Sequence, residues 1–330
     1  MKKLINKPES VVNACLKGFE AASGDLVAVY YDPNYVTRKH LKKGKVALLS
    51  GGGSGHEPLH AGFIGTGMLD AACPGDVFTS PTPIQMEAAT RAVDGGAGVL
   101  YIVKNYSGDI MNFEMAVDMC EGIQIATVIV DDDVAVKDSL YTIGRRGVGA
   151  TVFVEKIAGG SAERGDKLEK VVSYANYCRE NSRSMGMALT SCTVPAAGKP
   201  TFDIGDDEIE MGVGIHGEPG RIRMKHKPAN ELVDIMFQAV TDDLPYKNGE
   251  ASIVMLNGMG GTPLIELYGL YARVAELAAK KGIKIARNLV GNYITSLEMQ
   301  GFSLTMMKAT DEILSLWDAP VHTPGLRWGM

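Results

Sequence analysis

Residues 45–56 read Lys-Val-Ala-Leu-Leu-Ser-Gly-Gly-Gly-Ser-Gly-His. The apolar run Lys45–Leu49 is typical of a buried strand, and the small residues Gly51–Gly55 follow where it ends. Gly98–Val103 and Ile125–Val130 are strand-like in the same way, and a helical pattern from Ile110 to Cys120 lies between them. Strands separated by helix-length segments predict an α/β domain with mainly parallel pairing.

The second half of the chain repeats this rhythm. Strands are expected there at Met187–Ser191, Ser252–Asn257, Lys284–Leu289 and Phe302–Met307, and a helix at Pro263–Lys281. Two further helices are expected in the first half, at Pro58–Met68 after Gly51–Gly55 and at Gly165–Arg183. The 330 residues correspond to two domains at about 150 residues each. We therefore predict two α/β domains, residues 1–183 and 184–330, each with a mainly parallel or mixed sheet flanked by helices.

The composition excludes several classes of protein. Apolar residues make up 45% and charged residues 22%, which argues against a disordered chain. The 33 basic residues against 39 acidic ones give a net charge of −6 and offer no basic field for nucleic acid or an anionic membrane. The five cysteines are widely spaced and contain no Cys-x-x-Cys pair, so neither a disulfide framework nor a zinc site is indicated. We expect a reduced, cytoplasmic protein without a membrane span.

Two segments directly follow the carboxyl ends of predicted strands. Ligands of α/β proteins bind at this end of the sheet. The glycine segment, residues 51–55, can direct backbone N–H groups at an oxyanion or hydroxyl, or it can be a tight turn that needs positive φ. It has neither Walker A nor dinucleotide-binding spacing. In the second segment, Lys104–Asp109, the Asp109 carboxylate is interpreted either as the cap of the next helix or as a catalytic base.

Three histidines are candidates for the site. His56 directly follows the glycine segment, and we interpret it as a hydrogen-bonding or acid–base group. His60 is interpreted as a packed or surface residue, because Pro58 interrupts a zinc-binding helix pattern. His216 lies between Gly214 and Gly217, a setting that favours a site role as a base or nucleophile.

Two charged clusters have more ordinary interpretations beside the functional ones. Asp131–Asp133 resembles a divalent-metal cluster, but at a strand end it is more typical of solvated or capping residues. The pair Arg145-Arg146 could contact a phosphate or a partner, or could lie on the surface.

Four motifs in this order resemble the dihydroxyacetone kinase family, specifically its substrate-binding K subunit. They are Gly51–Pro58, Lys104–Asp109, Thr193–Pro195 and Gly214–Gly220, and Gly144–Gly147 and Ser296–Met299 are also similar to that family. The resemblance covers essentially the whole chain. Several separated motifs that match together are far more specific than any one glycine loop.

The resemblance implies a chemistry that the residues alone leave open. The histidine at position 216 would attack the C2 carbonyl of dihydroxyacetone and hold it as a covalent hemiaminal. Asp109 would accept the proton of the hydroxyl to be phosphorylated, and His56 would hydrogen-bond the substrate and assist that transfer. The groups that would orient the ketone are Gly53, Ser54, Gly55 and Lys104.

The resemblance also implies partners. The chain ends soon after its K-like region, so we expect the bacterial multi-subunit form, in which phosphate passes from phosphoenolpyruvate through the M phosphotransferase subunit to a nucleotide on the L subunit. No cofactor or metal is then expected in this chain, ADP/ATP and Mg²⁺ belong to the L subunit, and the chain forms a homodimer. The rival expectations are a coactivator paralogue of a transcription regulator, and a sugar-phosphate or nucleotide enzyme that uses the glycine segment as a phosphate cradle.

Overall fold

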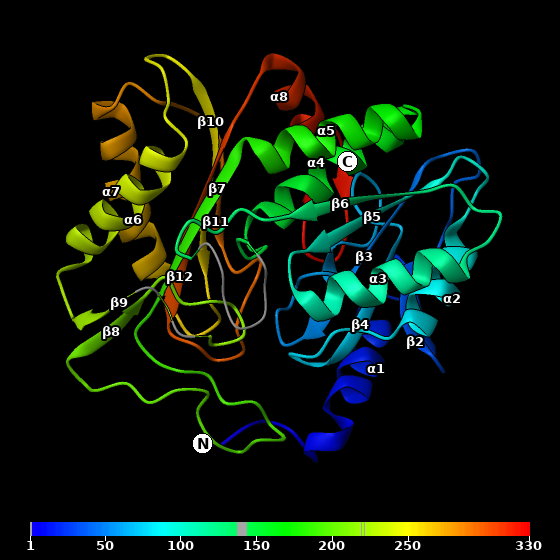
Figure 1. Cartoon of the computed structure of the whole chain (residues 1–330), viewed down its shortest axis with the longest axis horizontal. Coiled ribbons are helices and arrows are strands. Elements are labelled where there is room, and N and C mark those ends of the chain that lie inside the picture. Colours follow the sequence, from blue (N-terminus) through cyan, green and yellow to red (C-terminus); the bar gives the residue numbers. More distant parts are fainter. Residues whose placement is uncertain (1, 137–143, 219, 221) are drawn as a thin grey trace.

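The computed structural model describes residues 2–136, 144–218, 220 and 222–330 (Figure 1).

The first sheet is mixed and six-stranded. The strand order is β1-β2-β4-β3-β5-β6, with parallel pairing among β4, β3, β5 and β6. These strands are β1 (Val27–Tyr31), β2 (Asn34–Arg38), β3 (Ala47–Ser54), β4 (Ala71–Val77), β5 (Val99–Lys104) and β6 (Ile125–Val130). The three strands predicted for this half are confirmed as β3, β5 and β6.

The second sheet is also mixed, with strand order β11-β10-β12-β7-β8-β9. Its strands are β7 (Ser182–Ala188), β8 (Glu208–Met211), β9 (Ile222–Lys225), β10 (Ala251–Gly258), β11 (Lys284–Gly291) and β12 (Gly301–Lys308). Among these strands β10 and β11 are the parallel pair, and the other pairings are antiparallel. A short hairpin near the C-terminus pairs β13 (Val321–His322) with β14 (Arg327–Trp328). The predicted α/β class, with mixed sheets flanked by helices, is confirmed.

Helices cover both sheets in layers (Figure 1). They are α1 (Val11–Ser23), α2 (Pro83–Val93), α3 (Ser107–Met119), α4 (Ala150–Arg164), α5 (Leu168–Glu180), α6 (Ala229–Asp243), α7 (Leu264–Lys280) and α8 (Asp311–Asp318). Helices α2 and α3 pack on one face of the first sheet, and α6 and α7 pack on the second sheet. Helix α4 contacts β3 and β5 of the first sheet and β7 and β12 of the second, so it lies between the sheets.

Helix α4 is buried on every side, from Ala150 to Ala162. The sequence analysis contains no element here, because a helix without a polar face shows no amphipathic stripe. Two further expectations are shifted: the helix expected at Gly165–Arg183 is the shorter α5, and the strand expected at Met187–Ser191 ends at Ala188 as part of β7.

The helix expected over Pro58–Met68 is wrong. This segment holds only one 3₁₀ turn, η2 (Ala61–Phe63), within an otherwise irregular loop. Gly65 and Gly67 adopt φ values of +152° and +81°, which cannot continue a right-handed helix. The loop instead packs against the C-terminal segment, where the Gly325 N–H donates to Gly62 O at 2.7 Å.

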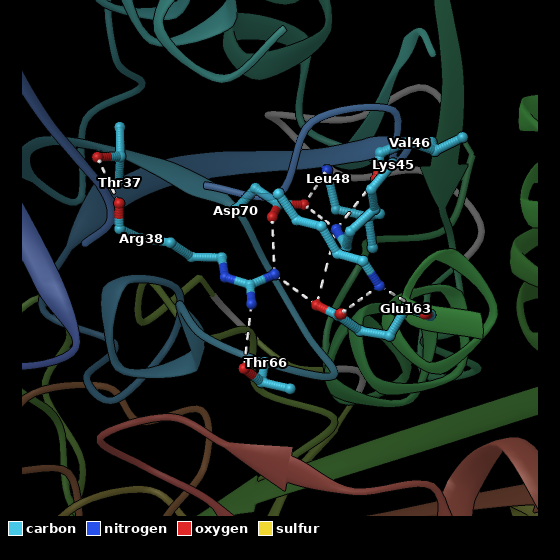
Figure 2. Close-up of polar contacts among 9 residues, drawn as sticks. Thr37, Arg38, Lys45, Val46, Leu48, Thr66, Asp70 and Glu163 are labelled. Carbon is cyan, nitrogen blue, oxygen red and sulfur yellow. Dashed lines mark hydrogen bonds and ion pairs between the residues drawn. The ribbon is translucent and has the colours of Figure 1, made fainter. Parts of the chain in front are cut away.

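A buried ionic cluster fastens the end of α4 to the first sheet (Figure 2). Arg38 donates to both Asp70 and Glu163, and Lys45 Nζ lies 2.5 Å from Asp70 Oδ2 and 4.0 Å from Glu163 Oε1. The more exposed Lys42 also lies 3.8 Å from Glu163 Oε2, so three cations surround two carboxylates. Lys45 precedes β3, whereas the glycine segment ends it, so this cluster and the glycine segment lie at opposite ends of the strand.

The hydrophobic core crosses the predicted domain boundary near residue 184. One cluster of buried residues includes Leu48 and Phe153 from the first half and Met255 and Trp317 from the second. Residues 311–318 form α8, which packs on α4. The division into residues 1–183 and 184–330 therefore stays a prediction.

Candidate active site

A cavity of about 720 Å³ opens beyond the ends of β3 and β5. Its walls include Gly53 from the glycine segment, Asp109 from the first turn of α3, and His216 with Glu218 from the segment that follows β8. The structure thus brings the segment around His216 next to residues that lie more than 100 positions earlier in the sequence. Pro219, which belongs to the quoted Gly214–Gly220 motif, lies outside the described residues.

The glycine segment is the end of strand β3 rather than a turn, since β3 runs to Ser54. Its glycines are needed for close approach: a Cβ on Gly52 would lie 2.3 Å from Lys104 Nζ, and a Cβ on Gly53 would lie 2.6 Å from the Thr79 nitrogen. Positive φ occurs at Gly55, at +105°. The tight-turn interpretation therefore applies to Gly55 alone.

His56 is buried next to Phe78 and His216, which line the cavity, but it is not itself one of the lining residues. Its Nδ1 lies 2.7 Å from the carbonyl oxygen of Thr295, and its Nε2 has no hydrogen-bond partner among the described residues. The ring stacks on Phe78 and meets the ring of His216 edge-on, with centroids 4.8 Å apart. Burial, together with neighbouring His216 and Lys104, lowers the pKa of His56 well below its usual value. A neutral ring that donates from Nδ1 keeps a free lone pair on Nε2.

His216 is held by the carboxylate two residues further on. Glu218 Oε1 lies 3.1 Å from His216 Nδ1, and Glu218 Oε2 accepts the His216 backbone N–H at 2.9 Å. Although burial would raise it, interactions with His216 and Arg146 lower the pKa of Glu218 to about 2. The ionised carboxylate accepts a hydrogen bond from the Nδ1–H group of His216. The other ring nitrogen, Nε2, is therefore the one available to the cavity. Sequence reasoning missed this role, although Glu218 stands inside a motif that it quoted.

Arg146 lies behind Glu218 and is fully buried, so the surface interpretation is wrong for this arginine. It donates to Asp133 Oδ2 at 2.8 Å and to the carbonyl of Gly212 at 2.7 Å. A Cβ on Gly214 would lie 2.0 Å from Glu218 Oε2 and 2.7 Å from Arg146 Nη1, so this glycine leaves the space that both charged groups use.

The three aspartates at 131–133 have separate structural roles. Asp131 pairs with Arg179, and Asp132 accepts the N–H groups of Val148 and Ala150 at the start of α4. Asp133 pairs with Arg146. Within the described ranges, no group of three or more His, Cys, Asp or Glu side chains is placed to hold a metal ion.

Asp109 lies in the first turn of α3, which begins at Ser107, so the helix-cap interpretation is wrong. Its buried carboxylate lines the cavity, and Oδ2 lies 3.6 Å from Lys104 Nζ. Lys104 is fully buried and reaches the cavity through this contact. Ser54 donates its hydroxyl to Gly75 O at 2.7 Å and so fixes the end of β3.

The chain is similar along its whole length to known kinase subunits. The model of the Dak1 domain matches residues 17–325. The PEP-dependent dihydroxyacetone kinase, dihydroxyacetone-binding subunit DhaK, of Escherichia coli (strain K12) is 49% identical over 356 residues, which covers 100% of both chains.

Solved structures give the same fold. The dihydroxyacetone kinase of C. freundii matches with 36% identity and a TM-score of 0.88, covering 99% of this chain and 60% of that one. The dihydroxyacetone kinase operon co-activator Dha-DhaQ matches with 30% identity and a TM-score of 0.88, covering 93% of this chain and 96% of the co-activator. No described helix is both long and apolar enough to cross a membrane.

Proposed function

The chain belongs to the Dak1 domain family, and from this premise we propose that it is the dihydroxyacetone-binding subunit of a dihydroxyacetone kinase, which holds its ketone covalently on His216. The observation that carries the proposal is the contact of the Glu218 carboxylate with both the Nδ1 atom and the backbone N–H of His216. It occupies Nδ1 and leaves Nε2 to the cavity that Asp109 also lines.

Capture begins when Nε2 of His216 forms a bond to C2 of dihydroxyacetone. The carbonyl π electrons move to the oxygen, which takes up a proton from solvent, and the product is a hemiaminal. The ring keeps its Nδ1 proton and becomes positively charged, and the adjacent Glu218 carboxylate compensates this charge. An alcohol such as glycerol carries no electrophilic carbonyl and is not retained, so selectivity rests on bond formation rather than on contacts worth ~1–3 kcal/mol.

Phosphorylation then uses the other wall of the cavity. The hydroxyl of the captured ketone gives its proton to Asp109, while its oxygen receives the phosphoryl group. His56 Nε2 is the acceptor that binds and orients the substrate, and the glycine segment lets Lys104 approach the end of β3 closely. Positioning of this kind supplies most of the catalysis in phosphoryl transfer.

We place the phosphoryl donor on a partner. Relatives named as PEP- or PTS-dependent dihydroxyacetone-binding subunits support a phosphate source outside this chain. In the proposal an L subunit carries ADP/ATP and Mg²⁺, and an M subunit recharges it. A cytoplasmic homodimer is the corresponding expectation for this chain.

The alternative is a sensor. The co-activator of the same fold, at 30% identity, supports a subunit that binds the ketone and acts on a transcription regulator. Presence of His216, Asp109 and His56 together favours the kinase. Reconstitution with L and M partners, phosphotransferase proteins and phosphoenolpyruvate separates the two, since a sensor yields no dihydroxyacetone phosphate.

The capture step is tested on the isolated chain. Native mass spectrometry with dihydroxyacetone should show the mass of one ketone added to the wild type and no such addition to His216→Ala. His226, which is exposed, supplies the matched control, and His226→Ala should capture the ketone normally. An adduct that persists on His216→Ala would refute the nucleophile assignment.

A further inference from the structure

Four buried polar side chains form a continuous row that starts at the cavity. Asp109 (α3) contacts Lys104 (end of β5), Lys104 contacts His60, and His60 contacts Glu155 (α4). Their exposed fractions are 3%, 0%, 6% and 0%. The row therefore leads from the candidate base through the sheet into the helix that lies between the two sheets.

The Lys104 ammonium has three acceptors around it. Nζ lies 2.9 Å from His60 Nε2, 3.1 Å from the carbonyl oxygen of Gly51 and 3.6 Å from Asp109 Oδ2. The first two contacts are hydrogen bonds from the ammonium, whereas the longer contact with Asp109 is an ion pair. The bare Cα of Gly52 leaves the space that Nζ occupies, because a Cβ there would lie 2.3 Å from it.

The contact with Lys104 fixes the tautomer of His60. An acceptor at Nε2 places the proton on Nδ1, and this nitrogen lies 2.6 Å from Glu155 Oε1. Burial, together with Lys104 and His56, lowers the pKa of His60 well below its usual value, so the ring stays neutral. Burial also raises the pKa of Glu155 well above its usual value, against the effect of Lys104.

We propose that His60 and Glu155 are positioning residues that hold the Lys104 ammonium between the glycine segment and Asp109. This inference rests on the proposed function. A lysine has a flexible four-carbon stem, and its ammonium is a point charge without the fixed fork of arginine. The imidazole lone pair limits where that charge can go, and Glu155 limits how the imidazole can turn. Asp109 thereby meets the substrate hydroxyl from a fixed position.

The first test separates capture from transfer. In His60→Leu, ketone capture should fall much less than transfer, because His60 contacts Lys104, which orients the ketone, but does not contact the nucleophile His216. Transfer in the system reconstituted with the L and M partners should fall about 10- to 100-fold in kcat, the loss that a displacement of about 1 Å produces. His60→Gln restores an acceptor oxygen and should recover most of that loss.

Thr90→Val is the matched control, because Thr90 is a buried polar residue that bonds to Tyr101 and lies outside the row. It should leave transfer unchanged. Transfer in His60→Leu that equals the control would overturn the inference, and so would a glutamine variant that is folded but no better than leucine. If His60→Leu does not fold, the next side chain in the row is tested instead. Glu155→Leu should then lower transfer, and Glu155→Gln should recover most of that loss.

The second test needs no activity. With the chain labelled with ¹⁵N-histidine, the NMR signal of His60 is the one that is missing from the spectrum of His60→Gln. In the wild type this signal should keep the pattern of the Nδ1–H tautomer between about pH 5 and 8, the range in which an ordinary histidine titrates. A His60 signal that titrates in this range would overturn the inference. Absence of ketone capture by the wild type would instead refute the proposed function, and the NMR result would still decide the state of His60.

Discussion

Replacing Glu218 by glutamine should show how strongly this carboxylate and His216 depend on each other. The carboxylate is almost fully buried and contacts both the side chain and the backbone N–H of His216. Its pKa falls from the ordinary 4.5 to about 2. At about 1.36 kcal/mol per pKa unit, this difference corresponds to about 3 kcal/mol of stabilisation of the folded state.

The pH dependence follows from the direction of the shift. Because the folded-state pKa is lower than the unfolded-state value, the stabilisation is fully present above pH 4.5 and is lost as the pH falls towards 2. Urea unfolding should therefore show Glu218→Gln about 3 kcal/mol less stable than wild type at pH 7, and the gap should close between pH 4.5 and 2. Ketone capture at pH 7 should fall as well, since the amide no longer compensates the charged ring.

Glu231→Gln is the control, because Glu231 makes an exposed ion pair with Lys227, four residues earlier in the sequence. Such a pair is worth about 0.3–0.5 kcal/mol, so this variant should unfold almost like the wild type at each pH. A gap for Glu218→Gln that is equal at pH 7 and pH 2.5 would show that packing, rather than charge, explains its effect. If Glu218→Gln captures the ketone normally, Glu218 has no role in the capture step.

Three further substitutions test separate parts of the argument. Asp109→Asn should capture the ketone normally while phosphoryl transfer falls about 10²–10⁴-fold, measured as dihydroxyacetone phosphate formed; equal loss of both would make Asp109 structural. Gly214→Ala should abolish capture, because its Cβ would lie 2.0 Å from Glu218 Oε2, whereas Gly18→Ala, with no described neighbour within 4 Å of the new Cβ, should capture normally in the same mass-spectrometric assay. Asp70→Asn should cost about 3–5 kcal/mol in urea unfolding, because two buried cations lose a shared partner, and capture by the folded fraction should not change.

The sequence predicts elements well where a local pattern defines them. Strands β3, β5 and β6 are apolar runs that end in polar or glycine-rich segments, and both features can be read from neighbouring residues. Helix α4 is buried by two sheets that are built from distant parts of the chain, so no local stripe marks it. The loop 58–68 appears apolar enough for a helix, but its apolar residues face the core and the C-terminal segment.

The site residues also divide into those that a local sequence pattern marks and those that it does not. His56, Asp109 and His216 stand out in the sequence because each lies beside glycines or after a strand. In the structure Asp109 and His216 line one cavity, and the ring of His56 contacts the ring of His216. Their supporting groups do not stand out. Glu155 is 95 residues from His60, and Arg146 looked like one of two surface arginines, so only the three-dimensional contacts reveal them.

The central position of α4 has a consequence for biosynthesis. While the ribosome is still translating the second sheet, α4 is already complete, yet the side that will meet β7 and β12 has nothing to cover it. Phe153 of this helix also packs against Trp317, which is made more than 150 residues later. The nascent protein must carry an exposed apolar helix through much of its synthesis, and chaperones that bind such surfaces are expected to act on it before release.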